Sequence, residues 1–327
     1  MYLIHGLSLL ARGPKTLAFF NFLKGVTHMA QWFNQQAAQS AAFKQLLKIA
    51  DEQGFTLIDP PMFIDYDDFR RDQPDQSPEA WIKVTNPQGR LLVLRPDLTT
   101  SVMDKLQWKA TDGPLKVCYY ASTFARTDDW FQATKEFGFE FFNAPVTEGE
   151  TLMQTTLTHL ITTFKLNLMV ECSHKDVFGI LMEQLQVPSP EIPQFKSWFH
   201  TKSLDAIKAW MASHGTDDAL KEFIELLFTK ALGFDALKET LKAYKLDGAF
   251  ASVMEAIEPF TSLPLAEVVV DFTLMSDWTY YSGLIFQAIS ERLASPLIRG
   301  GRYHVASLEG EAIGCSMTLD DLLEVTS

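Results

Sequence analysis

Two glutamates lie four residues apart in a segment with the alternation of a β-strand, residues 136–142 (Glu-Phe-Gly-Phe-Glu-Phe-Phe). Because side chains alternate along a strand, Glu136 and Glu140 share one face, with Gly138 between them. The opposite face carries Phe137, Phe139 and Phe141. Two carboxylates around a residue without a side chain form an acidic floor with room above it, which suits an ammonium or an imidazole group. The strand alone is equally consistent with a solvated outer face.

A second group of hydrogen-bonding side chains lies nearer the C-terminus. Tyr280 and Tyr281 begin a predicted strand, and the sequence Arg-Gly-Gly-Arg-Tyr follows at residues 299–303. Its two glycines predict a tight turn that a small molecule can approach closely, between the tyrosines and the pair Arg302 and Tyr303. These flat or forked groups suit a polar ligand. On this segment alone, a plain hairpin turn with sheet-packing tyrosines is the better interpretation.

The N-terminal half predicts alternating helices and strands. Apolar runs with turn signals at their ends predict strands at residues 55–58, 81–84, 90–94, 115–120, 136–142 and 168–172. Helical spacing predicts helices at residues 40–54, 98–108 and 147–164. Asp97 is the expected N-cap of the second helix, and residues 147–150 have the form of a capping box for the third. Residues 65–80 and 126–135 predict polar surface loops.

After Val187 the pattern changes to prolines and short helical segments, and strands return near residue 267. We expect strands at residues 267–272, 280–288 and 312–317, and a last helix at 319–324. The expected organisation is a segment of unknown role at 1–33, a domain in two parts at 34–187 and 263–327, and a helical insert at 188–262. The fold class that follows is α+β, an antiparallel sheet flanked by helices and interrupted by the insert.

The composition narrows the functional classes. The 327 residues carry a net charge of -13, which argues against a large RNA partner. The three cysteines, Cys118, Cys172 and Cys315, have no CxxC or Cys/His spacing, so we expect no disulfide framework, no metal site and a reduced, cytoplasmic location. No apolar run reaches the roughly 20 residues that a membrane span requires, so no membrane partner is expected.

Four blocks together resemble the catalytic domain of the histidyl-tRNA synthetases, a family of class II aminoacyl-tRNA synthetases. They are Leu-Arg-Pro-Asp-Leu-Thr at residues 94–99, the strand-loop-strand at 119–142, Tyr-Tyr at 280–281 with the Gly-Gly-Arg-Tyr segment, and Ile-Gly-Cys-Ser-Met-Thr-Leu at 313–319. Their order and spacing match over roughly residues 40–325, weakly in the helical insert. The resemblance implies a class II synthetase-like fold.

The same resemblance implies a histidine pocket. In the family, the positions of Asp97 and Thr99 hold the amino group of histidine, and those of Glu136, Glu140 and Tyr281 surround its amino and imidazole ends. The Gly-Gly-Arg-Tyr turn closes the pocket. The full set of expected histidine-binding residues is Asp97, Thr99, Arg126, Glu136, Glu140, Tyr280, Tyr281, Arg302 and Tyr303.

Three departures from the synthetase pattern concern the nucleotide. Where a synthetase has an arginine after the phenylalanine of its second motif, Phe124 is followed by Ala125, and Arg126 is displaced by one residue. The arginine of the third motif is matched by Asp-Asp at 320–321, and that of the Arg-Gly-Leu-Asp-Tyr-Tyr segment by Ser-Asp-Trp-Thr-Tyr-Tyr at 276–281. Carboxylates repel a triphosphate that guanidinium groups should neutralise, so we expect no adenylation.

The Tyr-Tyr-Ser-Gly-Leu-Ile-Phe run at 280–286 resembles more closely the regulatory subunits of ATP phosphoribosyltransferase. This resemblance implies a non-catalytic protein without a cofactor that binds histidine as an effector. It further implies a hetero-oligomer with a short-form catalytic subunit of that enzyme. The chain stops soon after the third motif, so we expect no anticodon-binding domain and no tRNA. Two alternatives stay open: a synthetase-like paralogue with residual amino-acid activation, in which Arg126 replaces the displaced arginine, and a structural scaffold with a vestigial pocket.

Overall fold

The computed structural model describes residues 14–73, 76–106, 113–127, 130–275, 281–305 and 310–327. Side chains are described from residue 32 onward within these ranges, except at 72, 104–106 and 305. Its centre is an eight-stranded sheet with the order β1-β5-β6-β11-β10-β9-β7-β8. The strands are β1 Thr56–Ile58, β5 Leu115–Arg126, β6 Phe131–Phe142, β7 Met169–His174, β8 Glu267–Val270, β9 Tyr281–Ile289, β10 Ile298–Val305 and β11 Gly310–Thr318. The short edge strands β1 and β8 pair in parallel with their neighbours, and the other pairs are antiparallel.

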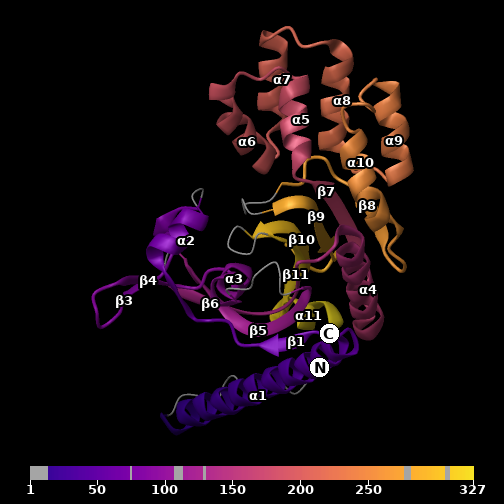
Figure 1. The fold of residues 1–327 in the computed structure, drawn as a ribbon. Helices are drawn as coiled ribbons and strands as arrows, with labels where there is room; N and C mark the ends of the chain where they lie inside the picture. Colours follow the sequence, from indigo (N-terminus) through magenta and orange to yellow (C-terminus); the bar gives the residue numbers. More distant parts are fainter. Residues whose placement is uncertain (1–13, 74–75, 107–112, 128–129, 276–280, 306–309) are drawn as a thin grey trace.

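One face of this sheet is covered by helices over an apolar core. Phe137, Phe139 and Phe141 of β6 are buried there, as the alternation predicts. The covering helices are α1 Pro14–Glu52, α4 Val146–Phe164 and α11 Leu319–Thr326. In Figure 1, α1 runs beneath the sheet and passes the C-terminal helix α11, against which it packs. The predicted helix at 40–54 is the last part of α1, and Gly54, with a φ of 77°, ends it.

A helical array connects β7 to β8. It consists of α5 Asp176–Gln184, η3 Ser189–Glu191, α6 Ile192–His200, α7 Leu204–Ser213, α8 Asp218–Thr229, α9 Phe234–Ala243, α10 Ala251–Ile257 and η4 Glu258–Ser262. Figure 1 shows these helices gathered at the β7–β8 edge of the sheet. Phe250, before α10, stacks on Phe272, after β8, with ring centroids 4.8 Å apart. The array and the sheet therefore share one apolar core.

A smaller antiparallel sheet, β2-β4-β3, lies beside the main one (Figure 1). Its strands are β2 Phe63–Asp65, β3 Lys83–Thr85 and β4 Leu91–Leu94, so the predicted hairpin is confirmed but lies outside the main sheet. β4 leads into α3 Leu98–Leu106. The prediction of a loop at 65–80 was wrong, because this segment contains α2 Tyr66–Asp72 and η1 Pro78–Ala80. Asp65 caps α2, and Phe69 packs edge-on against Trp81, with centroids 4.9 Å apart.

Three local predictions were also wrong. β5 and β6 extend to Arg126 and from Phe131, so the loop between them is far shorter than 126–135. Helix α4 has Pro145 at its N-cap and no side-chain cap, so the capping box does not form. Gly300 and Gly301 lie inside the central strand β10, and neither has a positive φ, so the tight turn does not exist.

In the part of the chain that the structure describes, no helix is long and apolar enough to cross a bilayer.

Candidate functional site

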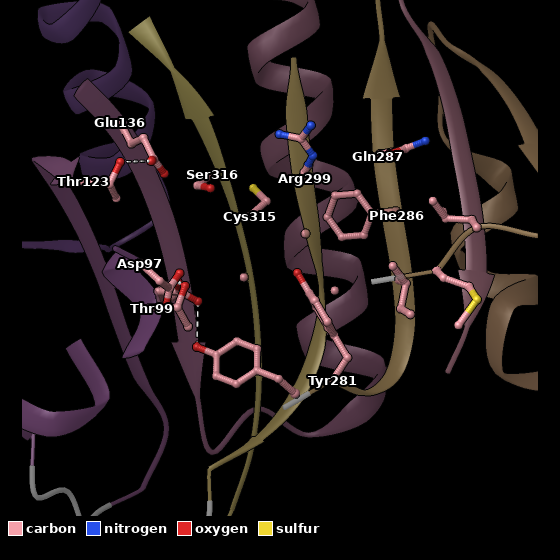
Figure 2. Close-up of a pocket in the computed structure, with 18 of the residues that line it drawn as sticks. Asp97, Thr99, Thr123, Glu136, Tyr281, Phe286, Gln287, Arg299, Cys315 and Ser316 are labelled. Carbon is pink, nitrogen blue, oxygen red and sulfur yellow. Dashed lines mark hydrogen bonds between the residues drawn. The ribbon is translucent and has the colours of Figure 1, made fainter. Parts of the chain in front are cut away.

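A cavity of about 360 Å³ opens on the sheet face opposite α1 and α4. Its walls come from the loop before α3, from α3 itself, and from strands β5, β6, β9, β10 and β11, as Figure 2 shows. Polar groups among its lining residues include Asp97, Thr99, Thr123, Glu136, Glu140, Tyr281, Gln287, Arg299, Tyr303 and Ser316. The acidic face of β6 is therefore the floor of a pocket and not a solvated outer surface.

Glu140 lies at the centre of a hydrogen-bond network and is only 1% exposed. Thr99 Oγ1 donates to Glu140 Oε1 over 2.7 Å, and Tyr303 Oη donates to Oε2 over 2.7 Å. The hydroxyl of Tyr119 also donates to Oε1, over 3.3 Å. Burial raises the pKa of Glu140 to about 7, although these hydroxyl groups oppose the rise. The carboxyl group is thus poised to exchange a proton near neutral pH.

Glu136 lies on the same face of β6, four residues before Glu140, with Gly138 between them. Its Oε1 accepts a hydrogen bond from Thr123 Oγ1 over 2.7 Å. Burial raises the pKa of Glu136 to about 7, the negative charge of Asp97 adds to the rise, and the positive charge of Arg299 opposes it. Glu136 and Glu140 therefore change protonation over the same pH range, and a cation in the pocket would favour the ionised form of both.

Asp97 connects the two glutamates electrostatically. It caps α3, because its Oδ2 accepts a hydrogen bond from the backbone N–H of Thr100 over 2.6 Å. Burial raises the pKa of Asp97, and its negative charge contributes to the raised pKa values of both Glu136 and Glu140. A cation that enters between these three carboxyl groups would favour their ionised forms.

Glycines give the pocket its shape, but not as the sequence suggested. The space above Gly138 is filled, because a Cβ there would collide with the ring of Tyr119. The predicted room above that glycine is therefore occupied by a tyrosine from β5. On β10, a Cβ at Gly301 would lie 2.6 Å from the ring of Tyr281, so this glycine allows the tyrosine ring to pack close against the strand.

The structure brings together six of the nine predicted site residues: Asp97, Thr99, Glu136, Glu140, Tyr281 and Tyr303. Tyr280 lies outside the described residues. Arg302 is buried on the opposite sheet face, where its guanidinium donates to the carbonyl oxygens of Ala144 (3.3 Å) and Val146 (2.9 Å) and lies 3.6 Å from a carboxylate oxygen of Glu150. Arg302 therefore holds β10 against α4 and does not reach the cavity.

Arg126 also lies outside the pocket. It is exposed at the end of β5, where it lines a separate hollow with Lys83 and Phe131. The displacement by one residue that the sequence shows therefore corresponds to a displacement out of the site.

Sequence reasoning missed several polar lining residues, of which Thr123, Arg299 and Ser316 are the most prominent. A signal existed for Arg299, because a strand that carries Tyr303 and Gly301 on the pocket face also carries Arg299 there. The mistaken turn at Gly300 hid this alternation. Among the described lining residues, Arg299 is the one cationic side chain.

Two positions where a synthetase has nucleotide-binding arginines, Ala125 and Asp320, can be described in the structure. Ala125 is exposed on β5. On α11, Asp320 Oδ1 accepts hydrogen bonds from the side-chain amides of Gln35 (3.3 Å) and Gln39 (2.8 Å) on α1. The carboxylate at this position therefore connects the first and last helices. Within the described ranges, no group of three or more His, Cys, Asp or Glu side chains is arranged to hold a metal ion.

The chain is similar to proteins of a known family. A family model described as histidyl-tRNA synthetase matches residues 32–322. The ATP phosphoribosyltransferase regulatory subunit of Oceanobacillus iheyensis is 26% identical over 285 residues, which are 83% of this chain and 69% of that protein. The sequence-based resemblance to such subunits is thus confirmed as a similarity.

Two solved structures are similar over most of the chain. A protein from Bacillus halodurans, titled as an ATP phosphoribosyltransferase regulatory subunit/histidyl-tRNA synthetase, gives a TM-score of 0.76 at 19% identity and covers 91% of this chain and 80% of its own. A chain of the ATP phosphoribosyl transferase complex of Thermotoga maritima gives 0.66 at 19% identity, covering 86% and 97%. These likenesses confirm the class II synthetase-like α+β fold, and the family model spans nearly all of the described sheet. The chain therefore belongs to the histidyl-tRNA synthetase family.

Proposed function

We propose that this chain is a non-catalytic regulatory subunit of ATP phosphoribosyltransferase, the enzyme of the first step of histidine biosynthesis, and that it binds histidine as a feedback effector. The names of its relatives support the regulatory role, and the Thermotoga maritima complex supports a hetero-oligomer with a short-form catalytic subunit. A reduced cytoplasm suits the three cysteines, which are buried and free.

The observation that carries the proposal is the network around Glu140. Its carboxyl group, held by Thr99 and Tyr303, offers a buried negative partner on the floor of the cavity. An imidazole or ammonium group needs such a partner, because an unpaired buried cation is strongly unfavourable. Histidine carries both groups, and the cavity of about 360 Å³ has room for it.

Charge argues against nucleotide activation and against tRNA. Three carboxyl groups and one guanidinium line the described part of the cavity, which leaves a triphosphate without the cations it requires. The net charge of -13 disfavours a polyanionic partner. The alternative of residual amino-acid activation requires Arg126 in the pocket. Arg126 lines a different hollow, which argues against this alternative.

Titration calorimetry of the full chain with histidine tests the proposal. We expect binding to the unchanged chain, and Glu140→Gln should weaken it about 10-fold or more, because a charge-assisted hydrogen bond is lost. Glu148→Gln is the matched control, since Glu148 is exposed in the first turn of α4. Equal affinities of the chain and the Glu140→Gln variant would contradict the pocket assignment.

A further inference from the structure

The polar groups of the pocket separate into two ends along strand β10. Tyr303, near one end of this strand, contacts Glu140. Arg299 lies four residues away, a distance of roughly 13 Å along a strand. Arg299 pairs with Ser316 of β11 on one side and with Gln287 of β9 on the other. Figure 2 shows its guanidinium between these two strands, away from Asp97 and Thr99.

The guanidinium of Arg299 has no partner of its own. Among the described residues, it makes no hydrogen bond and no ion pair, and the group remains open to solvent from the cavity. The chain's other pocket-facing charges are accounted for, since Glu136 and Glu140 accept hydrogen bonds from hydroxyl groups and Asp97 caps a helix. A forked donor in this setting is suited to a carboxylate supplied from outside.

Glu136, whose carboxyl group lies within the electrostatic reach of Arg299, suits the α-ammonium group of such a ligand. The α-ammonium and α-carboxylate of an amino acid are attached to the same carbon, so the residues that bind them must lie close together. Glu136 feels the positive charge of Arg299 and also the negative charge of Asp97. An ammonium group beside Glu136 would therefore place its carboxylate toward Arg299 and its side chain along the pocket toward Glu140.

We propose that Arg299 is a specificity-determining residue that binds the α-carboxylate of the ligand, so that the pocket takes a free amino acid and discriminates against the corresponding amine. This inference rests on the proposed function and adds the residue that recognises the carboxylate of the ligand. It assigns a role to the one cation of the described lining. Arg302, three residues further along β10, faces the other side of the sheet and does not contact the cavity.

A cycle of two ligands and two proteins tests the assignment. Histidine and histamine, which lacks the carboxylate, are titrated calorimetrically into the full chain and into Arg299→Met. We expect histidine binding to weaken about 10-fold or more in the variant, while histamine binding changes by less than about 2-fold. Arg126→Met is the matched control, because it removes an exposed arginine outside the cavity and should leave both affinities unchanged.

The outcomes separate the two proposals. If histidine binds the chain and Arg299→Met equally well, or if both ligands weaken equally, the role of Arg299 is overturned while histidine binding stands. If histidine does not bind the unchanged chain, the proposed function fails and this inference fails with it. Thermal unfolding of the variant shows whether its fold is intact, and Arg299→Lys, which keeps the charge without the fork, should retain part of the preference for histidine.

Discussion

The buried carboxyl group of Glu140 makes the stability of the folded chain depend on pH. Glu140 is held by three hydroxyl donors, yet burial still raises its pKa from 4.5 to about 7. The folded chain therefore binds this proton more tightly than the unfolded chain does. The stabilising contribution is fully present below pH 4.5 and is lost as the pH rises through about 7, because the ionised form is poorly solvated in the pocket.

Replacing Glu140 by glutamine should remove this pH dependence. Between pH 5 and pH 8 we expect the stability of Glu140→Gln to rise relative to the unchanged chain by about 2 kcal/mol. Urea denaturation at the two pH values measures the difference. Glu148→Gln should show no such change, and a stability difference for Glu140→Gln that is the same at both pH values would contradict the raised pKa.

At the scale of the elements, the pocket depends on close packing between strands. β10 lies between β9 and β11. The absence of a side chain at Gly301 allows the ring of Tyr281 to pack against β10. A side chain at this position would meet both the tyrosine ring and the backbone oxygen of Leu284. The backbone oxygen cannot move without disturbing the ladder between β9 and β10.

Gly301→Ala should therefore destabilise the chain by about 1–3 kcal/mol and weaken ligand binding, because Tyr281 must leave its place. Chemical denaturation and calorimetry measure the two effects. Gly179→Ala is the matched control. Nothing lies within 4 Å of a Cβ at Gly179, which is inside helix α5, so alanine there should be neutral or stabilising by up to about 1 kcal/mol. Similar stabilities for the two variants would show that β10 tolerates a side chain.

The features that could be predicted from the sequence are those encoded by a local pattern of side chains, such as strand alternation or a helix cap. The alternation of residues 136–142 correctly placed Glu136 and Glu140 on a common face, and Asp97 was correctly assigned as a helix cap. The Gly-Gly pair was misassigned because turn glycines and packing glycines are identical in sequence. The contacts from the neighbouring strands, which include the rings of Phe286 and Tyr281 and the backbone oxygens of Gly314 and Leu284, show that these are packing glycines.

Helix α2 escaped prediction for a related reason. Its composition is typical of a loop, and the contact that stabilises it, between Phe69 and Trp81, comes from tertiary packing. Arg302 was assigned to the site for the same reason. The mistaken turn hid the strand alternation, which places Arg302 on the face opposite Tyr303.

At the scale of the whole molecule, the pocket and the helical array are parts of one body. Leu274 and Met275, which line the cavity, follow Asp271 after strand β8. Lys202 of the array lies 3.2 Å from Asp271 and also contacts Thr273. A ligand that repositions this segment would therefore act on the array. Under the proposed function, any coupling between histidine and the catalytic subunit is reciprocal.

Phosphoribosyl transfer by the co-purified complex tests this coupling. We expect the chain to activate the short-form catalytic subunit and histidine to lower that activity. Glu140→Gln should keep the activation while raising the histidine concentration for half inhibition about 10-fold or more, since only effector binding is impaired. Unchanged inhibition of the Glu140→Gln complex would place the effector site elsewhere. An activity that ignores histidine altogether would favour a scaffold, and histidine-dependent pyrophosphate exchange would favour residual activation.

The contact between Tyr303 and Glu140 joins residues 163 positions apart, whereas Thr99 and Glu140 are separated by only 41. No short contiguous fragment of the chain can carry the complete pocket. During synthesis, residues 298–305 must leave the ribosome before β10 can join the sheet that contains β6. Under the proposed function, a fragment that ends before β10 lacks Tyr303 and should therefore fail to bind histidine.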